Sequence, residues 1–300
     1  MHDHAHHHHH GHQSGKRLRV AFFLNLTFTV LEVVGGLWTN SMAILSDALH
    51  DLGDSVALGM AWFLDHLAQR KGDAVFSFGY RRFSLLGALI NALVLIAGSL
   101  IILVHAVPRI LSPEGAYAPG MIAFALLGIV VNGAAVLRLK GGATENERVV
   151  TWHLLEDVLG WVAVLVVSVV MLFFDVPVFD PILAVLVTLY VLWNVIKSLK
   201  RTLILFLQGV PETILLGDVE AAILAVEGVQ SVHHIHVWSQ DGEHHVLTAH
   251  VVAGQSGSLL EAQTLRRNIQ EAMRKFGIGH TTIEIEDPHG EGCPAGVDCY

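Results

Sequence analysis

The chain has 300 residues, of which 53% are hydrophobic and only 15% are charged, and its mean hydropathy is +0.54. These values lie outside the range of soluble domains and predict a membrane protein. The net charge of −9 comes from residues 211–300, which carry 13 acidic and 4 basic side chains. Such a surface excludes nucleic acid as a partner and attracts cations.

The first 16 residues are predicted to form a histidine-rich cytoplasmic leader. Eight of the 20 histidines lie in residues 1–12. A cysteine-free histidine tract binds Zn²⁺ weakly and raises its local concentration. A purification tag is the alternative, but the interspersed Asp3 and Ala5 favour a natural leader.

Residues 17–208 are predicted to form a domain of six transmembrane helices. Six apolar stretches reach the length of about 20 residues that crosses a bilayer. They cover residues 18–39, 42–66, 83–106, 118–139, 148–174 and 181–206. Thirteen Lys and Arg flank these stretches on one side of the membrane, whereas Arg109 alone lies on the other. Because basic residues favour the cytoplasmic side, both termini are predicted to lie in the cytoplasm, with the chain in the cell's inner membrane.

Two of the predicted spans carry the same polar pattern. His50 and Asp54 lie four residues apart in the second span, and His153 and Asp157 repeat this spacing in the fifth. Residues four apart lie on one face of a helix. From the helical rise, each pair lies about 12 to 18 Å along its span, so all four side chains are predicted to meet near the middle of the membrane. For the fifth span, this estimate takes a capping box of Thr144 and Glu147 as the helix start.

Two imidazoles and two carboxylates form a four-ligand set that suits tetrahedral Zn²⁺. The spans contain no thiolate, which argues against Cu(I). Hydrogen bonding between helices is the alternative explanation for a single such pair, and its repetition in two spans favours metal. The other acidic residues of the spans are interpreted as helix-packing or cavity groups: Glu32, Asp47, Asp51 and Glu156.

Residues 209–289 are predicted to form a small cytoplasmic α+β domain. Helical periodicity covers residues 211–226, with Pro211 in the first helical position, and residues 258–276. Alternation predicts strands at residues 229–238, 246–253 and 281–285. The resulting order αββαβ is typical of a ferredoxin-like fold. Residues 290–300 form a tail in which Cys293 and Cys299 are candidate metal ligands, with an inert tail as the alternative.

These features together resemble the cation diffusion facilitator family, in its zinc-transporting bacterial branch. The resemblance rests on the six spans, the two His-x₃-Asp pairs, the histidine-rich leader and the segments VHHIHVW and TTIEIEDP. It implies a homodimeric Zn²⁺/H⁺ antiporter that exports metal from the cytoplasm by alternating access. It also implies that His50, Asp54, His153 and Asp157 form the transport site.

The resemblance further implies bound zinc in the C-terminal domain. Ligands are expected at His233, His250 and Glu286, with helpers at His234, His236, His280 and Glu284. Strand alternation places His234 and His236 on one face and His233 on the other. Relatives with an additional metal site in the loop after the second span have histidine where this chain has Phe76 and Tyr80.

Two other functions remain alternatives. A membrane metallohydrolase would need three protein ligands, an open position for water and a general base, which Asp51 or Glu156 would have to supply. A membrane-anchored metal sensor or scaffold would bind zinc in its C-terminal domain and use the spans only as an anchor. The sequence does not decide among Zn²⁺, Cd²⁺, Co²⁺, Ni²⁺ and Fe²⁺.

Overall fold

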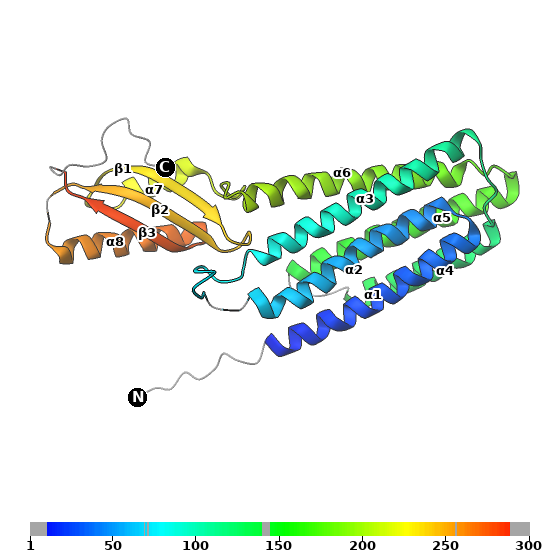
Figure 1. Ribbon diagram of the computed structural model, residues 1–300, viewed down its shortest axis with the longest axis horizontal. Coiled ribbons are helices and arrows are strands. Elements are labelled where there is room, and N and C mark those ends of the chain that lie inside the picture. The colour runs from blue at the N-terminus through cyan, green and yellow to red at the C-terminus, as the bar shows by residue number, and fades with distance from the viewer. Residues whose placement is uncertain (1–10, 69, 71, 140–144, 256, 289–300) are drawn as a thin grey trace. The chain divides into compact units, whose positions relative to one another are not determined.

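A computed structural model describes residues 11–68, 70, 72–139, 145–255 and 257–288. Six long helices and a small α/β domain make up the fold (Figure 1). The chain divides into two compact units, one of Met1–Asp65 with Gly87–Leu199 and the other of His66–Leu86 with Lys200–Tyr300. The predicted leader and the Cys293/Cys299 tail lie outside the described residues, apart from the leader's last residues at the start of the first helix.

The six long helices agree with the six predicted spans. They are α1 (Gly11–Thr39), α2 (Met42–Ala68), α3 (Phe83–Leu111), α4 (Ala118–Leu139), α5 (Glu145–Phe174) and α6 (Phe179–Phe206). All except α2 contain a segment long and apolar enough to cross a membrane. At 27 residues α2 is also long enough, but it differs from the others in carrying three acidic residues close together, Asp47, Asp51 and Asp54. The start of α5 at Glu145 agrees with the predicted helix start, whereas the capping box stays a prediction because Thr144 lies outside the described residues.

Close approach and buried polar bonds hold α2 in place. A Cβ on Gly53 would collide with Leu95 of α3, and a Cβ on Gly98 of α3 would collide with Leu49. Small residues allow this approach of helices in membranes. On the side of α6, α2 shares a hydrogen bond of 2.8 Å between Ser46 Oγ and Thr188 Oγ1.

A buried carboxylate on α6 caps the first turn of α2. Asp180 accepts hydrogen bonds from the Ser41 hydroxyl at 2.6 Å, the Met42 amide at 2.7 Å and the Ala43 amide at 3.2 Å. The first amides of a helix have no partner within it, so this carboxylate satisfies two of them and also opposes the positive end of the helix dipole. The register of α2 against α6 is therefore fixed at this end.

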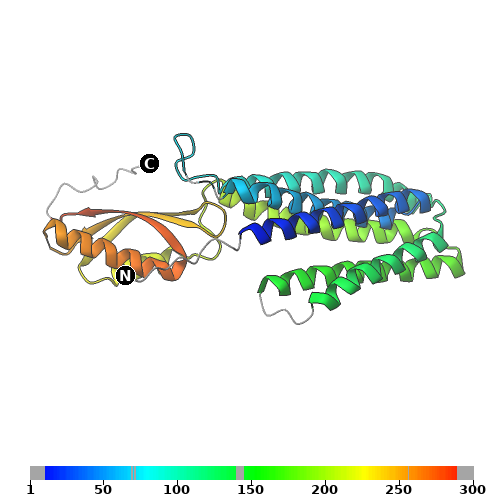
Figure 2. The same cartoon turned by 90° about the horizontal axis from the view of Figure 1, so that it is seen from below.

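The C-terminal domain has the predicted order αββαβ. Its elements are α7 (Leu216–Leu224), β1 (Val229–Ser239), β2 (His245–Ala253), α8 (Leu259–Met273), a 3₁₀ turn at Arg274–Phe276 and β3 (Ile278–Glu286). The sheet order is β1-β2-β3, with β1 antiparallel and β3 parallel to β2. Both helices pack on one face of the sheet over a single apolar core (Figure 2).

The predicted start of the first helix in this domain is wrong. Pro211 precedes α7, which begins at Leu216. The amide of Ile214 donates instead to the Pro211 carbonyl at 2.9 Å, closing a turn. Ile214 is buried in the domain core, so its burial favours the turn over an early helical start.

Strand β1 contains a bulge that changes which histidines share a face. His233 pairs with His250, but the next pair is His236 with Thr248, so β1 has one extra residue there. His234 has a φ of +49°, the left-handed region that non-glycine residues seldom adopt. The predicted alternation therefore fails, and His233 lies on the same face as His236 instead of opposite it.

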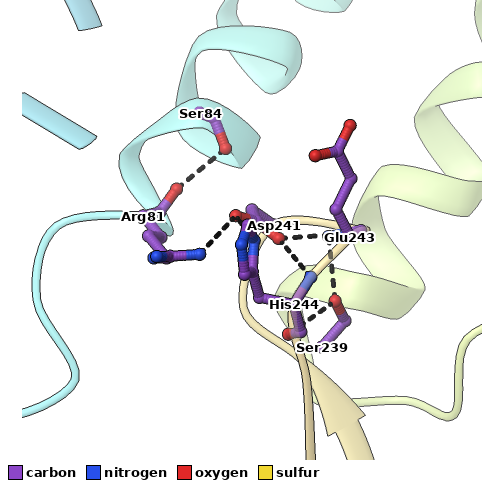
Figure 3. Close-up of polar contacts among 7 residues, drawn as sticks. Arg81, Ser84, Ser239, Asp241, Glu243 and His244 are labelled. Atoms are coloured by element: carbon purple, nitrogen blue, oxygen red, sulfur yellow. Dashed lines mark hydrogen bonds and ion pairs between the residues drawn. The ribbon is translucent and has the colours of Figure 1, made fainter. Parts of the chain in front are cut away.

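The turn between β1 and β2 contacts the segment that joins α2 to α3. Asp241 accepts hydrogen bonds from the amides of Glu243 and His244 and pairs with the His244 ring, and Arg81 lies 4.0 Å from it (Figure 3). Burial raises the pKa of Asp241, but these backbone and ring hydrogen bonds outweigh burial and leave the pKa below its usual value. In the same segment, the Tyr80 hydroxyl donates to Asp73 at 2.6 Å.

Candidate functional site

The two polar pairs predicted for the membrane domain come together in the structure. His50 and Asp54 lie one turn apart on α2, and His153 and Asp157 lie one turn apart on α5. The two helices belong to the same compact unit. Their ligand atoms meet although about 100 residues of chain separate them.

The shortest contact joins the two helices directly. Nε2 of His153 lies 2.9 Å from Oδ2 of Asp54. Nε2 of His50 lies 4.0 Å from the same carboxylate oxygen and 3.9 Å from Oδ1 of Asp157. The rings of His50 and His153 meet edge to face with centroids 5.6 Å apart. His50, Asp54 and His153 each offer one ligand atom within 4.8 Å of the others, and Asp157 joins this group through His50.

These four side chains are suited to a divalent cation. All are partly buried, with 11% of the Asp157 side chain and 40% of the His153 side chain exposed. Nδ1 of His50 is buried and has no hydrogen-bond partner among the described residues. Two carboxylates balance the charge of a divalent ion, and neutral imidazoles complete an N₂O₂ set of the kind that zinc prefers. An ion would replace the contacts that His153 now makes with Asp54.

A second group of possible metal ligands lies in the C-terminal domain. His233, His250 and Glu286 each offer one ligand atom within 4.8 Å of the others. Nδ1 of His250 is 2.8 Å and Nε2 of His233 is 3.3 Å from Oε1 of Glu286. His250 and Glu286 alternate along their strands with core residues such as Val251 and Ile285, so the group lies on the sheet face away from the helices.

The four predicted helpers divide into near and distant residues. His234 packs its ring against both His233 and His250, and His236 stacks on His234. Oε2 of Glu284 lies 3.5 Å from Nε2 of His250. His280 pairs instead with Val246, four positions along the sheet, and its ring meets Phe78. His280 is therefore about 13 Å from the group at the rise of a strand.

Comparison with known proteins assigns the chain to a family. The model of the cation efflux transmembrane domain matches residues 18–207, and that of the cytoplasmic domain of cation efflux proteins matches residues 211–288. The chain belongs to the cation diffusion facilitator family of cation efflux proteins. The expected resemblance is thus confirmed, as is a helical membrane domain followed by a small α/β domain.

Several named cation efflux proteins align with this chain over most of its length. A cadmium, cobalt and zinc/H(+)-K(+) antiporter of Bacillus subtilis is 33% identical over 275 residues, which are 90% of this chain and 88% of the relative. The metal cation efflux system protein CzcD of Cupriavidus metallidurans is 36% identical over 95% of this chain and 89% of its own. Zinc transporter ZitB of Pectobacterium atrosepticum is 35% identical over 91% and 86%. All three are transporters, and the expectation that the chain is not an enzyme is confirmed.

Sequence reasoning missed one residue that positions this site. Asp180 caps α2, the helix that carries His50 and Asp54, from α6. The available signal was an aspartate just before a proline at the start of an apolar span. That pattern indicates a cap for its own helix and gives no hint that it caps another.

Proposed function

We propose that the protein exports divalent metal, zinc foremost, from the cytoplasm in exchange for protons by alternating access. The observation that carries this proposal is the convergence of His50 and Asp54 on α2 with His153 and Asp157 on α5. The relatives support it, because they are named for zinc, cadmium and cobalt efflux and one is named an H(+)-K(+) antiporter. Potassium is therefore a second counter-ion to test.

The chemistry of the four residues explains an exchange of metal for protons. Carboxylates and imidazoles bind a metal ion only when they are deprotonated, so metal binding releases protons. When the ion leaves on the other side, the two carboxylates remain in a membrane interior where unpaired charge is costly. Protons then occupy His153 and Asp54, which already lie at hydrogen-bonding distance. The net charge of the site therefore stays close to zero both with metal bound and with protons bound.

The orientation of the protein follows from its basic residues. We place both termini and the C-terminal domain in the cytoplasm, because thirteen Lys and Arg flank the spans on that side. We place the chain in the inner membrane because its relatives are bacterial cation efflux proteins. Domain limits of 1–16, 17–208, 209–289 and 290–300 agree with this arrangement. The working unit is a homodimer, as the family resemblance implies.

Zinc binding by His233, His250 and Glu286 would make the rate of transport depend on the zinc concentration in the cytoplasm. The nitrogen and oxygen donors of this group fit zinc, and Glu284 lies close enough to assist. The group also keeps a second candidate function open, that of a membrane-anchored metal sensor. In that case the C-terminal ligands would be essential and the α2 and α5 ligands dispensable.

Zinc flux into proteoliposomes separates these functions. The wild type should move zinc against a pH gradient, and Asp54→Asn and His153→Ala should each lower flux by about a hundredfold or more, because losing a ligand should cost at least as much as losing an outer-shell partner, which costs about 10–100-fold. Glu286→Gln should keep flux at saturating zinc and lose its response to low zinc. The matched control is Glu156→Gln, which changes an exposed acid on α5. Wild-type flux in both ligand variants would overturn the transport proposal.

A further inference from the structure

Glu32 on α1 is a fully buried carboxylate that the transport site does not use. None of its surface is exposed, and its carboxylate oxygens have no hydrogen-bond partner among the described residues apart from their close approach to the carboxylate of Asp51. An unpaired ionised carboxylate in such surroundings is costly, so a buried group of this kind holds a proton or a cation. Ionisable groups within a membrane span are by default functional.

The groups that face Glu32 are also acidic. Asp47 and Asp51 of α2 and Asp157 of α5 lie within electrostatic range of it. Asp51 is 7% exposed, and Oδ1 of Asp47 lies 3.7 Å from the point where a Cβ on Gly160 of α5 would stand.

Within the described spans of α1, α2, α5 and α6, no Lys or Arg side chain lies near enough in sequence to compensate for this negative charge. The sequence has no Lys or Arg from Val20 to Gln69, or from Val149 to Ile196. The nearest bases are His50 and His153, which belong to the metal site. Like charges gathered in low dielectric cannot all remain ionised. This group therefore requires a bound cation of its own.

The donor atoms distinguish this group from the metal site. Glu32, Asp47 and Asp51 supply only oxygen, and the same helices also carry the polar side chains of Asn25, Thr29, Ser46 and Ser55. Oxygen ligands without imidazole suit a proton or a hard cation better than zinc. The chemistry thus points to a monovalent ion.

The place of the group in the fold connects it to the metal site. Asp51 follows His50 directly, and Asp47 precedes His50 by about 4.5 Å along α2. Glu32 lies about 10 Å from the end of α1 at Thr39. Along α2, Asp47 therefore lies between the α1–α2 connection and His50, whereas Asp51 lies beyond His50, so the acidic group is level with the metal ligands.

We propose that Glu32, flanked by Asp47 and Asp51, forms a second cation site that holds a further counter-ion exchanged for metal, in addition to the protons taken up by His153 and Asp54. The ion is a proton or a potassium ion, and the inference rests on the proposed antiport. Metal arriving at His50 and Asp54 adds positive charge directly beside Asp51 and expels the ion from Glu32. When the metal leaves, Glu32 takes up a new ion from the open side, so each carboxylate that loses a cation later regains one.

Two gradient experiments with the full-length protein in proteoliposomes test the proposal. Zinc flux is driven by a pH gradient at equal potassium, and separately by a potassium gradient at equal pH. Glu32→Gln keeps the side-chain volume but removes the charge, and should lower flux about tenfold in one arm, within the usual range of coupling between two sites. Lower zinc flux under the pH gradient would identify the ion at Glu32 as a proton, and lower zinc flux under the potassium gradient would identify it as potassium. Glu114→Gln, a charge-neutralising change at the exposed partner of Arg109, is the matched control.

Zinc affinity of the detergent-solubilised protein, measured by calorimetry, separates this role from metal binding. Glu32→Gln should keep the wild-type affinity within about threefold, because Glu32 is not a ligand. Unchanged flux in both arms, or a loss of zinc binding that matches the loss of flux, would overturn the proposal. A wild type that moves no zinc would instead refute the transport function itself.

A measurement on the wild type covers the case in which Glu32→Gln does not fold. Dicyclohexylcarbodiimide modifies protonated carboxyl groups in apolar surroundings, and mass spectrometry locates the modified residue. Glu32 should be modified in zinc-free protein and protected by saturating zinc or, if potassium is the ion, by potassium. Modification of Glu32 that neither ion changes would contradict a counter-ion site.

Discussion

Oδ2 of Asp180 on α6 accepts a hydrogen bond of 2.7 Å from the backbone amide of Met42, the first residue of α2. We expect Asp180→Asn to lower the free energy of unfolding by about 1–3 kcal/mol, because the amide that replaces one oxygen faces a backbone donor. Thermal unfolding in detergent measures this change. Asp175→Asn, at the nearby end of α5, should leave the unfolding temperature unchanged. An equal effect of both variants would mean that the bonds to α2 contribute nothing specific.

Zinc binding to the membrane site should strengthen as the pH rises. Protons compete with the metal for His153 and Asp54, so affinity should change by up to about tenfold per pH unit for each proton displaced. Calorimetry in two buffers with different ionisation enthalpies measures the proton release directly. Glu156→Gln should retain the wild-type release. Binding without proton release would contradict metal coordination by these side chains.

The bulge at His234 should tolerate glycine and reject a β-branched residue. Glycine adopts a φ of +49° without strain, so His234→Gly should change stability by no more than about 1 kcal/mol. Valine at this φ costs about 1–3 kcal/mol and favours a straight strand, which would move His233 away from His250. We therefore expect His234→Val to lose zinc binding by the C-terminal domain and His234→Gly to keep it. Calorimetry on variants that also carry Asp54→Asn isolates this site.

The stability of the C-terminal sheet should fall below a pH of about 6.5, the usual pKa of histidine. Burial lowers the pKa of His245 in the folded state, so the unfolded chain takes up the proton first as the pH falls. Hydrogen exchange of β1 and β2 peptides in the full-length protein should accelerate over this range. His245→Gln should reduce the pH dependence, whereas His280→Gln should retain it. The same acceleration in both variants would assign the effect to another group.

Much of the fold was predictable because the membrane imposes a simple pattern on the sequence. Apolar length located all six helices, and the repeated four-residue spacing identified His50, Asp54, His153 and Asp157 as a group. Alternation located the three strands of the C-terminal domain. All of these features follow from the spacing of apolar and polar residues, which is visible in the sequence alone.

The parts that sequence could not supply depend on contacts between distant elements. The cap that Asp180 places on α2 joins residues 138 positions apart. The bulge at His234 depends on pairing with β2. It brings His233 beside Glu286, whereas strict alternation places the His233 side chain on the opposite face from His236. Likewise, Ile214 forms a turn because it is buried under the sheet, whereas its local sequence predicted a helix.

The capped end of α2 is a fixed point from which the metal ligands are displaced. Asp54 lies twelve residues beyond Met42, or about 18 Å along the helix axis. A tilt of ~10° about that end would swing Asp54 through ~3 Å, whereas a zinc–ligand bond tolerates an error of only about 0.2 Å. A small tilt of α2 about its capped end is therefore enough to form or break the bonds between its ligands and the metal.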